Sequence, residues 1–228
     1  MDLMLWSDET LLVVNKPAGL LVIPGGYGEE DNVRQMLESD YGRVWIVHRL
    51  DRHTSGVLVV TRTAHAHRAL NTQFEEHRVH KTYHALVNGV PRWNRLTIDR
   101  PLQPNGDRRH RTVVSEKGKP SRTEVQVLER FAECALVEAT PKTGRTHQIR
   151  AHLAASGYPI VADRLYRGQL LASQSIDRPA LHALSIEFNH PTTQKTVRFE
   201  APYPADLAST LDQLRNPHPA QPAEPGTN

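Results

Sequence analysis

A short apolar run at residues 57–60 constrains the fold most, because it follows directly on a densely charged turn. The run reads Val-Leu-Val-Val, which is too short for an ordinary helix and rich in β-branched side chains, so it predicts a buried strand. The ten residues before it contain one carboxylate, Asp51, two arginines, two histidines and a terminal glycine, Gly56. We therefore expect a turn that holds Asp51 at the mouth of a sheet.

Further strands and helices follow along the chain without a regular βαβ repeat. Apolar or alternating runs predict strands at 11–14, 20–23, 57–61, 81–87, 122–131, 134–140, 183–188 and 196–199. Helical spacing predicts helices at 32–41, 63–77 and within 143–156, where Gly157 is the expected stop. This mixed order predicts an α+β protein.

Positive charge is concentrated in one polar stretch of a nearly neutral chain. Residues 92–122 hold nine lysines and arginines against three acidic residues, a net charge of +6, whereas the whole chain carries +3. Such a block is typical of proteins that bind a polyanion, and a solvated loop is the ordinary structural alternative. Charge alone therefore favours nucleic acid as a partner only slightly.

Composition argues against several other classes of protein. No run approaches the roughly 18–20 apolar residues of a membrane span. The first eight residues lack the basic and apolar regions of a secretion signal, and the single cysteine, Cys134, allows no internal disulfide. The glycines at 25, 26 and 28 do not have the spacing of a phosphate loop. We expect a cytoplasmic protein.

Three residues stand out as candidates for chemistry, although each has an ordinary structural explanation. Asp51 fits a salt-bridged surface loop, Tyr83 fits a half-buried aromatic residue on a strand, and Arg150 fits a charge on a helix surface. They are far apart in the sequence, so only the fold could bring them together.

Several separated motifs, in one order, resemble those of the RluA-type RNA pseudouridine synthases. The motifs are Asn-Lys-Pro-Ala-Gly at 15–19, His-Arg-Leu-Asp at 48–51, Thr-Ser-Gly at 54–56, Lys-Thr-Tyr at 81–83, the segments 141–153 and 159–163, and Leu-His-Ala at 181–183. The resemblance covers about residues 5–204. It implies a mixed, largely antiparallel sheet with flanking helices and loops and a central active-site cleft. We expect this catalytic domain over 1–215 and a Pro-rich, disordered tail over 216–228.

The resemblance implies an isomerase that converts uridine in structured RNA to pseudouridine, a reaction that needs no cofactor and no metal. Asp51 matches the family's catalytic aspartate, and Arg150 matches the arginine that pairs with it. Tyr83 matches the tyrosine that stacks on the uracil, where a flat ring can hold a base while it turns. Arg49 matches the arginine that helps to fill the space left by the extruded base. Whether Asp51 attacks the sugar, attacks the base or removes a sugar proton stays open.

Basic residues outside these positions are expected to contact the RNA backbone. Lys142 and Arg145, close to a predicted helix start, are candidate phosphate ligands, and Arg108, Arg109 and Arg111 of the basic block are expected to bind along the strand. The partner is expected to be a stem-loop of ribosomal or transfer RNA, bound by a monomer without membrane contact. Because the chain starts almost at its first predicted strand, we expect no separate N-terminal RNA-binding domain.

Two other classes of function remain as alternatives. The thirteen histidines suggest a metal hydrolase, especially the groups His65/His67, His77/His80/His84 and His147/His152, although no His-Glu-x-x-His motif or cysteine pair accompanies them. A non-catalytic RNA-binding module would keep the basic block without needing Asp51, Tyr83 or Arg150.

Overall fold

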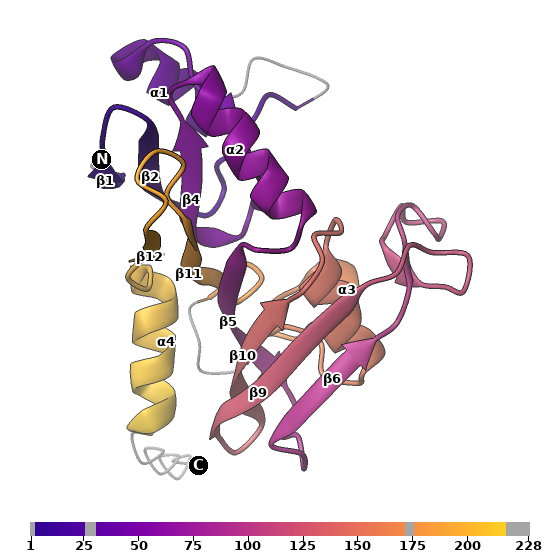
Figure 1. Ribbon diagram of the computed structural model, residues 1–228. Helices are drawn as coiled ribbons and strands as arrows, with labels where there is room; N and C mark the ends of the chain where they lie inside the picture. Colours follow the sequence, from indigo (N-terminus) through magenta and orange to yellow (C-terminus); the bar gives the residue numbers. More distant parts are fainter. Residues whose placement is uncertain (1–2, 26–30, 172–175, 218–228) are drawn as a thin grey trace, which may run out of the picture.

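A mixed ten-stranded sheet runs through the molecule, with helices packed against its two halves (Figure 1). The computed structural model describes residues 3–25, 31–171 and 176–217. The first half of the sheet contains β1 (Met4–Ser7), β2 (Leu11–Lys16), β3 (Trp45–Ile46), β4 (Ser55–Thr61), β11 (Leu181–Asn189) and β12 (Thr196–Glu200). The second half contains β5 (His80–Asn88), β6 (Arg95–Asp99), β9 (Arg122–Arg130) and β10 (Cys134–Pro141).

The strand order is β1-β2-β4-β11-β5-β10-β9-β6, with β3 beside β4 and β12 beside β11. In the described part of this sheet, the strands pair antiparallel except for β4 with β11. The α+β class and the mixed, largely antiparallel sheet predicted from the sequence are therefore confirmed.

Four α-helices of the described residues cover the sheet. Helices α1 (Val33–Tyr41) and α2 (Ala64–Glu75) pack on the first half, and α3 (Gln148–Ala155) packs on the second. Helix α4 (Ala205–Arg215) buries Leu207 and Leu211 in the core of the second half and runs below β12 in Figure 1. Thr63 caps α2 by accepting a hydrogen bond from the Ala66 amide at 3.1 Å, as its position before an apolar helical pattern predicts.

The hydrophobic core is divided into two large clusters, one for each half of the sheet. One cluster gathers side chains of β5, β9, β10 and α3, and the other gathers side chains of β2, β4, α1 and α2. Tyr83 of β5 is partly buried against both clusters. Tyr83 therefore lies where the two halves of the sheet meet.

The strand predicted at 20–23 is wrong. Leu21 forms only an isolated bridge, and the carbonyls of Leu21 and Val22 accept hydrogen bonds from the amides of Val33 and Arg34. The segment therefore satisfies free N–H groups in the first turn of α1 instead of joining the sheet.

The basic stretch between 90 and 119 is more ordered than its polar composition suggests. Besides β6 it contains a small hairpin of β7 (Leu102–Gln103) and β8 (Val113–Val114). Leu102 is fully buried in a small cluster with Ala151 of α3 and Tyr166 of the 3-10 helix η1 (Arg164–Tyr166). The hairpin is thereby anchored beside α3. Of the tail predicted over 216–228, residues 218–228 lie outside the described residues.

Gly56 is expected to be sensitive to substitution because its backbone lies against β11. Its φ is +120°, and a Cβ atom there would lie 2.2 Å from the carbonyl oxygen of Ala183. Gly56→Ala should therefore lower the free energy of unfolding by about 2–3 kcal/mol, through backbone strain and overpacking. Gly157→Ala is a control, because Gly157 also has positive φ but open space around it, and should cost about 1 kcal/mol. Equal losses in urea denaturation would contradict the role assigned to the close approach.

Candidate active site

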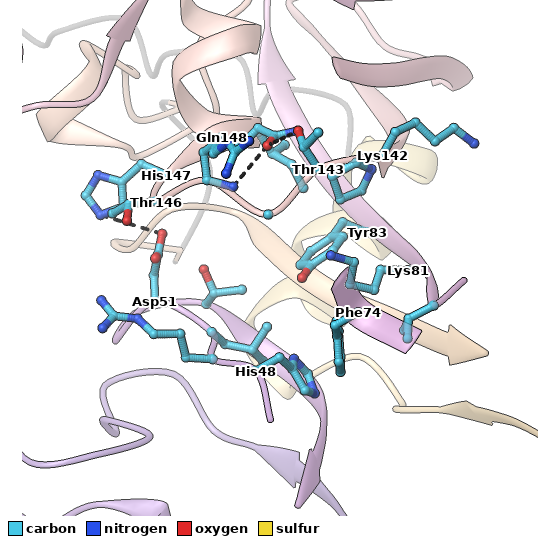
Figure 2. A pocket seen from close by; sticks show the side chains of 18 of the residues that line it. His48, Asp51, Phe74, Lys81, Tyr83, Lys142, Thr143, Thr146, His147 and Gln148 are labelled. Atoms are coloured by element: carbon cyan, nitrogen blue, oxygen red, sulfur yellow. Dashed lines mark hydrogen bonds and ion pairs between the residues drawn. The ribbon is translucent and has the colours of Figure 1, made fainter. Parts of the chain in front are cut away.

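A pocket of about 630 Å³ opens between the two halves of the sheet. Three segments line most of it, namely 47–54 before β4, 74–83 from the end of α2 into β5, and 141–150 from the end of β10 into α3. Figure 2 shows Asp51 and His147 at one end of this pocket, and Tyr83, Lys81, Phe74 and His48 at the other. The pocket thus combines the predicted motifs that are distant in the sequence.

A buried lysine, Lys16, hydrogen-bonds to the backbone of the turn that carries Asp51. Lys16 is fully buried and donates hydrogen bonds to the carbonyls of Pro17 (2.8 Å), Leu20 (2.8 Å) and Arg52 (3.1 Å). Burial and then the charge of Arg178 lower the pKa of Lys16 to about 7, against the opposing charge of Asp51. The Lys-Pro motif near the N-terminus therefore fixes the backbone next to the carboxylate.

A second cation fixes the same turn from the C-terminal side. Arg178 donates to the carbonyl of His53 at 3.2 Å and forms a two-point ion pair with Asp206 of α4, at 2.6 and 2.8 Å. The hydrogen bond from the Thr54 amide to the Asp51 carbonyl, at 3.1 Å, closes the turn. Asp51 thus stands on a backbone whose carbonyls have defined partners.

Arg150 joins Asp51 to a buried second carboxylate. Its Nη1 lies 3.1 Å from Asp51 Oδ2, while its Nε and Nη2 lie 2.7 and 2.9 Å from the two oxygens of Asp163. The ion pair predicted between Arg150 and Asp51 is therefore present, and Asp163 is a partner that the sequence did not reveal. Burial disfavours the guanidinium charge, but the hydrogen bonds and charges of Asp163 and Asp51 outweigh it and raise the pKa of Arg150.

His147 completes this end of the pocket. Its backbone is left-handed, with φ of +54°, and its Nε2 lies 3.7 Å from Asp51 Oδ2 while its Nδ1 lies 3.2 Å from the Tyr166 hydroxyl. Burial lowers the pKa of His147, and the charge of Asp51 opposes that shift. Tyr166 also lies under the Arg150 guanidinium, 5.1 Å from its ring centre. The sequence suggests His147 as a metal ligand and does not predict this contact with Asp51.

Tyr83 faces the pocket from β5, with its hydroxyl directed towards the end where Asp51 lies (Figure 2). Burial, and then the charge of Asp51, raise the pKa of Tyr83, so the phenol stays protonated at neutral pH. The ring is partly buried and lines the pocket, which gives a planar base a surface to stack on.

His48 and Phe74 form the aromatic floor beyond Tyr83. Their rings stack with centres 5.2 Å apart, and His48 Nε2 accepts a hydrogen bond from the Val59 amide at 3.0 Å. Burial and the charge of Lys81 lower the pKa of His48 to about 3. His48 is therefore neutral and shapes the pocket wall.

Of the remaining predicted basic residues, some are exposed and others already contact groups of the protein. Arg49 is exposed at the pocket mouth, and Arg108 and Arg109 are exposed on the turn before β8. Lys142 forms an ion pair with Glu124 at 2.9 Å, and Arg145 donates to the Pro120 carbonyl at 3.3 Å.

Arg111 is half-buried and holds the basic loop in place. It forms an ion pair with Asp107 at 2.6 Å and donates to the Leu165 carbonyl at 3.2 Å. It also lies over the ring of Tyr166, at 5.9 Å. Its charge is thus largely used within the protein, in contrast to those of Arg108 and Arg109.

The histidines considered as metal ligands have separate surroundings. His147 faces Asp51, whereas His152 contacts the Thr123 hydroxyl at 2.8 Å and the Arg100 carbonyl at 2.9 Å. Across residues 3–25, 31–171 and 176–217, no three His, Cys, Asp or Glu side chains gather in a way that could hold a metal ion. In those same ranges, no helix has the length and apolar character needed to cross a membrane.

Comparisons with known proteins agree with the geometry. A family model described as RNA pseudouridylate synthase matches residues 10–155. Ribosomal large subunit pseudouridine synthase C of Pasteurella multocida is 41% identical over 222 residues, covering 92% of this chain and 67% of the relative. The protein of the same name from Escherichia coli K12 is 40% identical over 228 residues, covering 94% and 70%.

Solved structures show the same likeness. Human RNA Pseudouridylate Synthase Domain Containing 4 superposes with a TM-score of 0.77 at 26% identity, covering 93% of this chain and 92% of that one. Human RNA Pseudouridylate Synthase Domain Containing 1 gives a TM-score of 0.74 at 27% identity, covering 93% and 94%.

Proposed function

The chain belongs to the RNA pseudouridylate synthase family and is an RNA pseudouridine synthase, an isomerase, and from this premise we propose that Asp51 is its catalytic carboxylate. The observation that carries the proposal is the placement of Asp51, fixed by Arg150, across one pocket from Tyr83. The reaction breaks the bond between uracil N1 and the sugar and joins uracil C5 to the same sugar carbon. C5 loses a proton and N1 gains one, so no atoms are added.

This reaction requires a reactive carboxylate and a surface for the base in the pocket. The carboxylate has to be ionised and within reach of the nucleotide, whether it attacks the sugar, attacks the base or removes a sugar proton. Arg150 donates to the Asp51 carboxylate and orients it, and its second partner Asp163 keeps the guanidinium in position. Tyr83 supplies a surface on which uracil can turn, and its protonated hydroxyl can take part in proton transfer at C5.

Arg49 is proposed to assist extrusion of the target base. It projects from the pocket mouth, two residues before Asp51, and is exposed. Extrusion of a paired base costs a few kcal/mol, and a guanidinium that occupies the vacated space stacks on the neighbouring bases and offsets part of that cost.

We further propose large-subunit ribosomal RNA as the substrate, because relatives at about 40% identity carry that name. The test is to map pseudouridines in total RNA from cells with and without the gene, and from cells complemented with the wild type. Loss of one or more sites in large-subunit RNA, restored on complementation, is expected. Loss confined to transfer RNA would contradict the ribosomal assignment, and unchanged maps would contradict the proposed function.

We propose that the active species is a monomer. A ribosomal substrate also supports a cytoplasmic location. A mass in solution near 25.7 kDa, measured by light scattering, is the expected result for the active species.

Arg108 and Arg109 are proposed to bind the RNA backbone, and Arg111 to hold their loop in place. Each phosphate contact contributes about 0.7–0.9 to the slope of log affinity against log salt concentration. Arg108→Ala/Arg109→Ala should therefore weaken RNA binding and reduce the slope by about 1–2. Adding Arg111→Ala should also lower stability, because the ion pair with Asp107 is lost. A salt slope unchanged in the triple variant would contradict RNA contact by this loop.

A further inference from the structure

Lys81 is a mostly buried cation in the pocket wall. It lies on β5 two residues before Tyr83, and both side chains line the pocket. Within the described residues, its ammonium has no carboxylate partner and no hydrogen-bond acceptor, and its one recorded contact is with the ring of Phe74, at 5.8 Å from the ring centre. Buried lysines are normally paired, so an unpaired one in a pocket points to a missing anion.

The other cations near the pocket do not share this condition. Lys142 is neutralised by Glu124, Arg145 is bound to a carbonyl, and Arg49 is exposed to water. Burial lowers the pKa of Lys81, which shows that the protein does not compensate the charge it places there. The neighbouring His48 is neutral and adds no negative charge.

The Lys81 ammonium lies at the pocket, close to the loop before α3. A Cβ atom built on Gly144 would be in ordinary van der Waals contact with Lys81 Nζ, at 3.9 Å, and both residues line the pocket, from which an anion can reach the ammonium. Figure 2 shows Lys81 beside Tyr83 and below the segment that carries Thr143. The segment before α3 contributes Lys142 and Arg145 to the pocket lining, and β5 contributes Lys81.

We propose that Lys81 binds a backbone phosphate next to the target uridine while its base lies on Tyr83. The inference rests on the proposed function, because it takes the occupant of the pocket to be a nucleotide of RNA. Residues two apart on a strand are about 7 Å apart and point to the same side, so Lys81 and Tyr83 can hold two parts of one nucleotide. A phosphate carries a full negative charge that can compensate this ammonium, whereas a uracil carbonyl offers only a dipole.

Single neutral linkages in the RNA can test the contact. The probe is a stem-loop that carries the uridine found by mapping, with the phosphate on its 5′ or its 3′ side replaced by a methylphosphonate. In the wild type, one of the two substitutions should lower kcat/KM by about 10- to 100-fold, the range for a hydrogen bond to a charged group. In Lys81→Met, the same substitution should change kcat/KM by less than about two-fold, because the partner is already gone. Lys81→Arg should regain part of the sensitivity.

The controls separate a phosphate contact from a structural role and from failure of the proposed function. Lys195→Met removes a charge from an exposed lysine on the turn between β11 and β12 and should respond to both linkages as the wild type does. The same set of comparisons is repeated in an Asp51→Asn background with equilibrium RNA affinity as the measured quantity, because binding needs no turnover. A wild type that binds the mapped stem-loop but forms no pseudouridine in it would contradict the proposed function, and the affinity cycle on that stem-loop would still test Lys81.

Two results would overturn the inference. One is an equal penalty for the neutral linkage in the wild type and in Lys81→Met, which would mean that Lys81 contacts something other than that phosphate. The other is the absence of any penalty at either linkage in the wild type. If Lys81→Met does not fold, as judged by its urea midpoint, Lys81→Gln replaces it in the same cycle.

Discussion

Replacing Asp51 with asparagine is expected to abolish pseudouridine formation while the protein folds and binds RNA. The substitution removes the ionised oxygen and keeps the size of the side chain, so activity should fall by a factor on the order of 10³ or more. Arg150 keeps its two-point ion pair with Asp163, so the guanidinium stays compensated and the fold should persist. RNA affinity should be unchanged or higher, since a negative charge near a polyanion is removed.

The measurement compares single-turnover pseudouridine formation with equilibrium binding of the same stem-loop. Asp40→Asn is the matched control, because Asp40 is an exposed residue on α1, outside the pocket lining, and its loss should leave both quantities unchanged. Activity of Asp51→Asn within about ten-fold of the wild type would show that another group carries the reaction.

Replacing Asp163 with asparagine is expected to have the largest effect on stability. Asp163 is fully buried and makes two of the three ion-pair contacts of Arg150, whose side chain is only 10% exposed. Without Asp163 the buried guanidinium keeps only its one contact with the partly exposed Asp51, so its charge is largely uncompensated, which costs about 3–5 kcal/mol in the free energy of unfolding. Activity should also fall, because Arg150 would no longer be held at Asp51.

A double variant distinguishes loss of this ion pair from a general packing defect. Arg150→Met in the Asp163→Asn background removes the uncompensated charge, so the double variant should be more stable than the sum of the two single losses predicts, by at least about 1 kcal/mol. Urea denaturation of the four proteins gives this coupling energy. Additive losses would contradict the assignment of the cost to an unpaired Arg150.

The sequence predicted the parts of the site that lie in local motifs. Asp51, Tyr83 and Arg150 each belong to a recognisable segment, and the fold places all three on one pocket. Asp163 and His147 were not predicted as partners, because their roles depend on which side chains meet in the folded protein. Asp163 ends the motif at 159–163, but its complete burial and its ion pair with Arg150 are visible only in the fold.

The sequence does not show how deeply a charged side chain is buried. Lys16 and Lys81 belong to motifs, but the sequence did not predict that one is fully buried under the Asp51 turn and that the other lines the pocket. Arg111, which we expect from the sequence to contact RNA, also ties a loop to η1, a contact that the sequence did not predict. The strand predicted at 20–23 was wrong for a related reason, since an apolar run does not reveal that its carbonyls serve a neighbouring helix.

The parallel pairing of β4 with β11 determines when the enzyme can become active during its synthesis. Ser55 and His182 hydrogen-bond to each other at 3.0 Å across 127 positions, and Arg178 reaches back 125 positions to the His53 carbonyl. A nascent chain on the ribosome therefore contains Asp51 long before it contains the residues that fix the turn around it. A nascent chain that has not yet reached Asp206 therefore lacks the contacts that fix the Asp51 turn, and we expect it to be inactive on RNA.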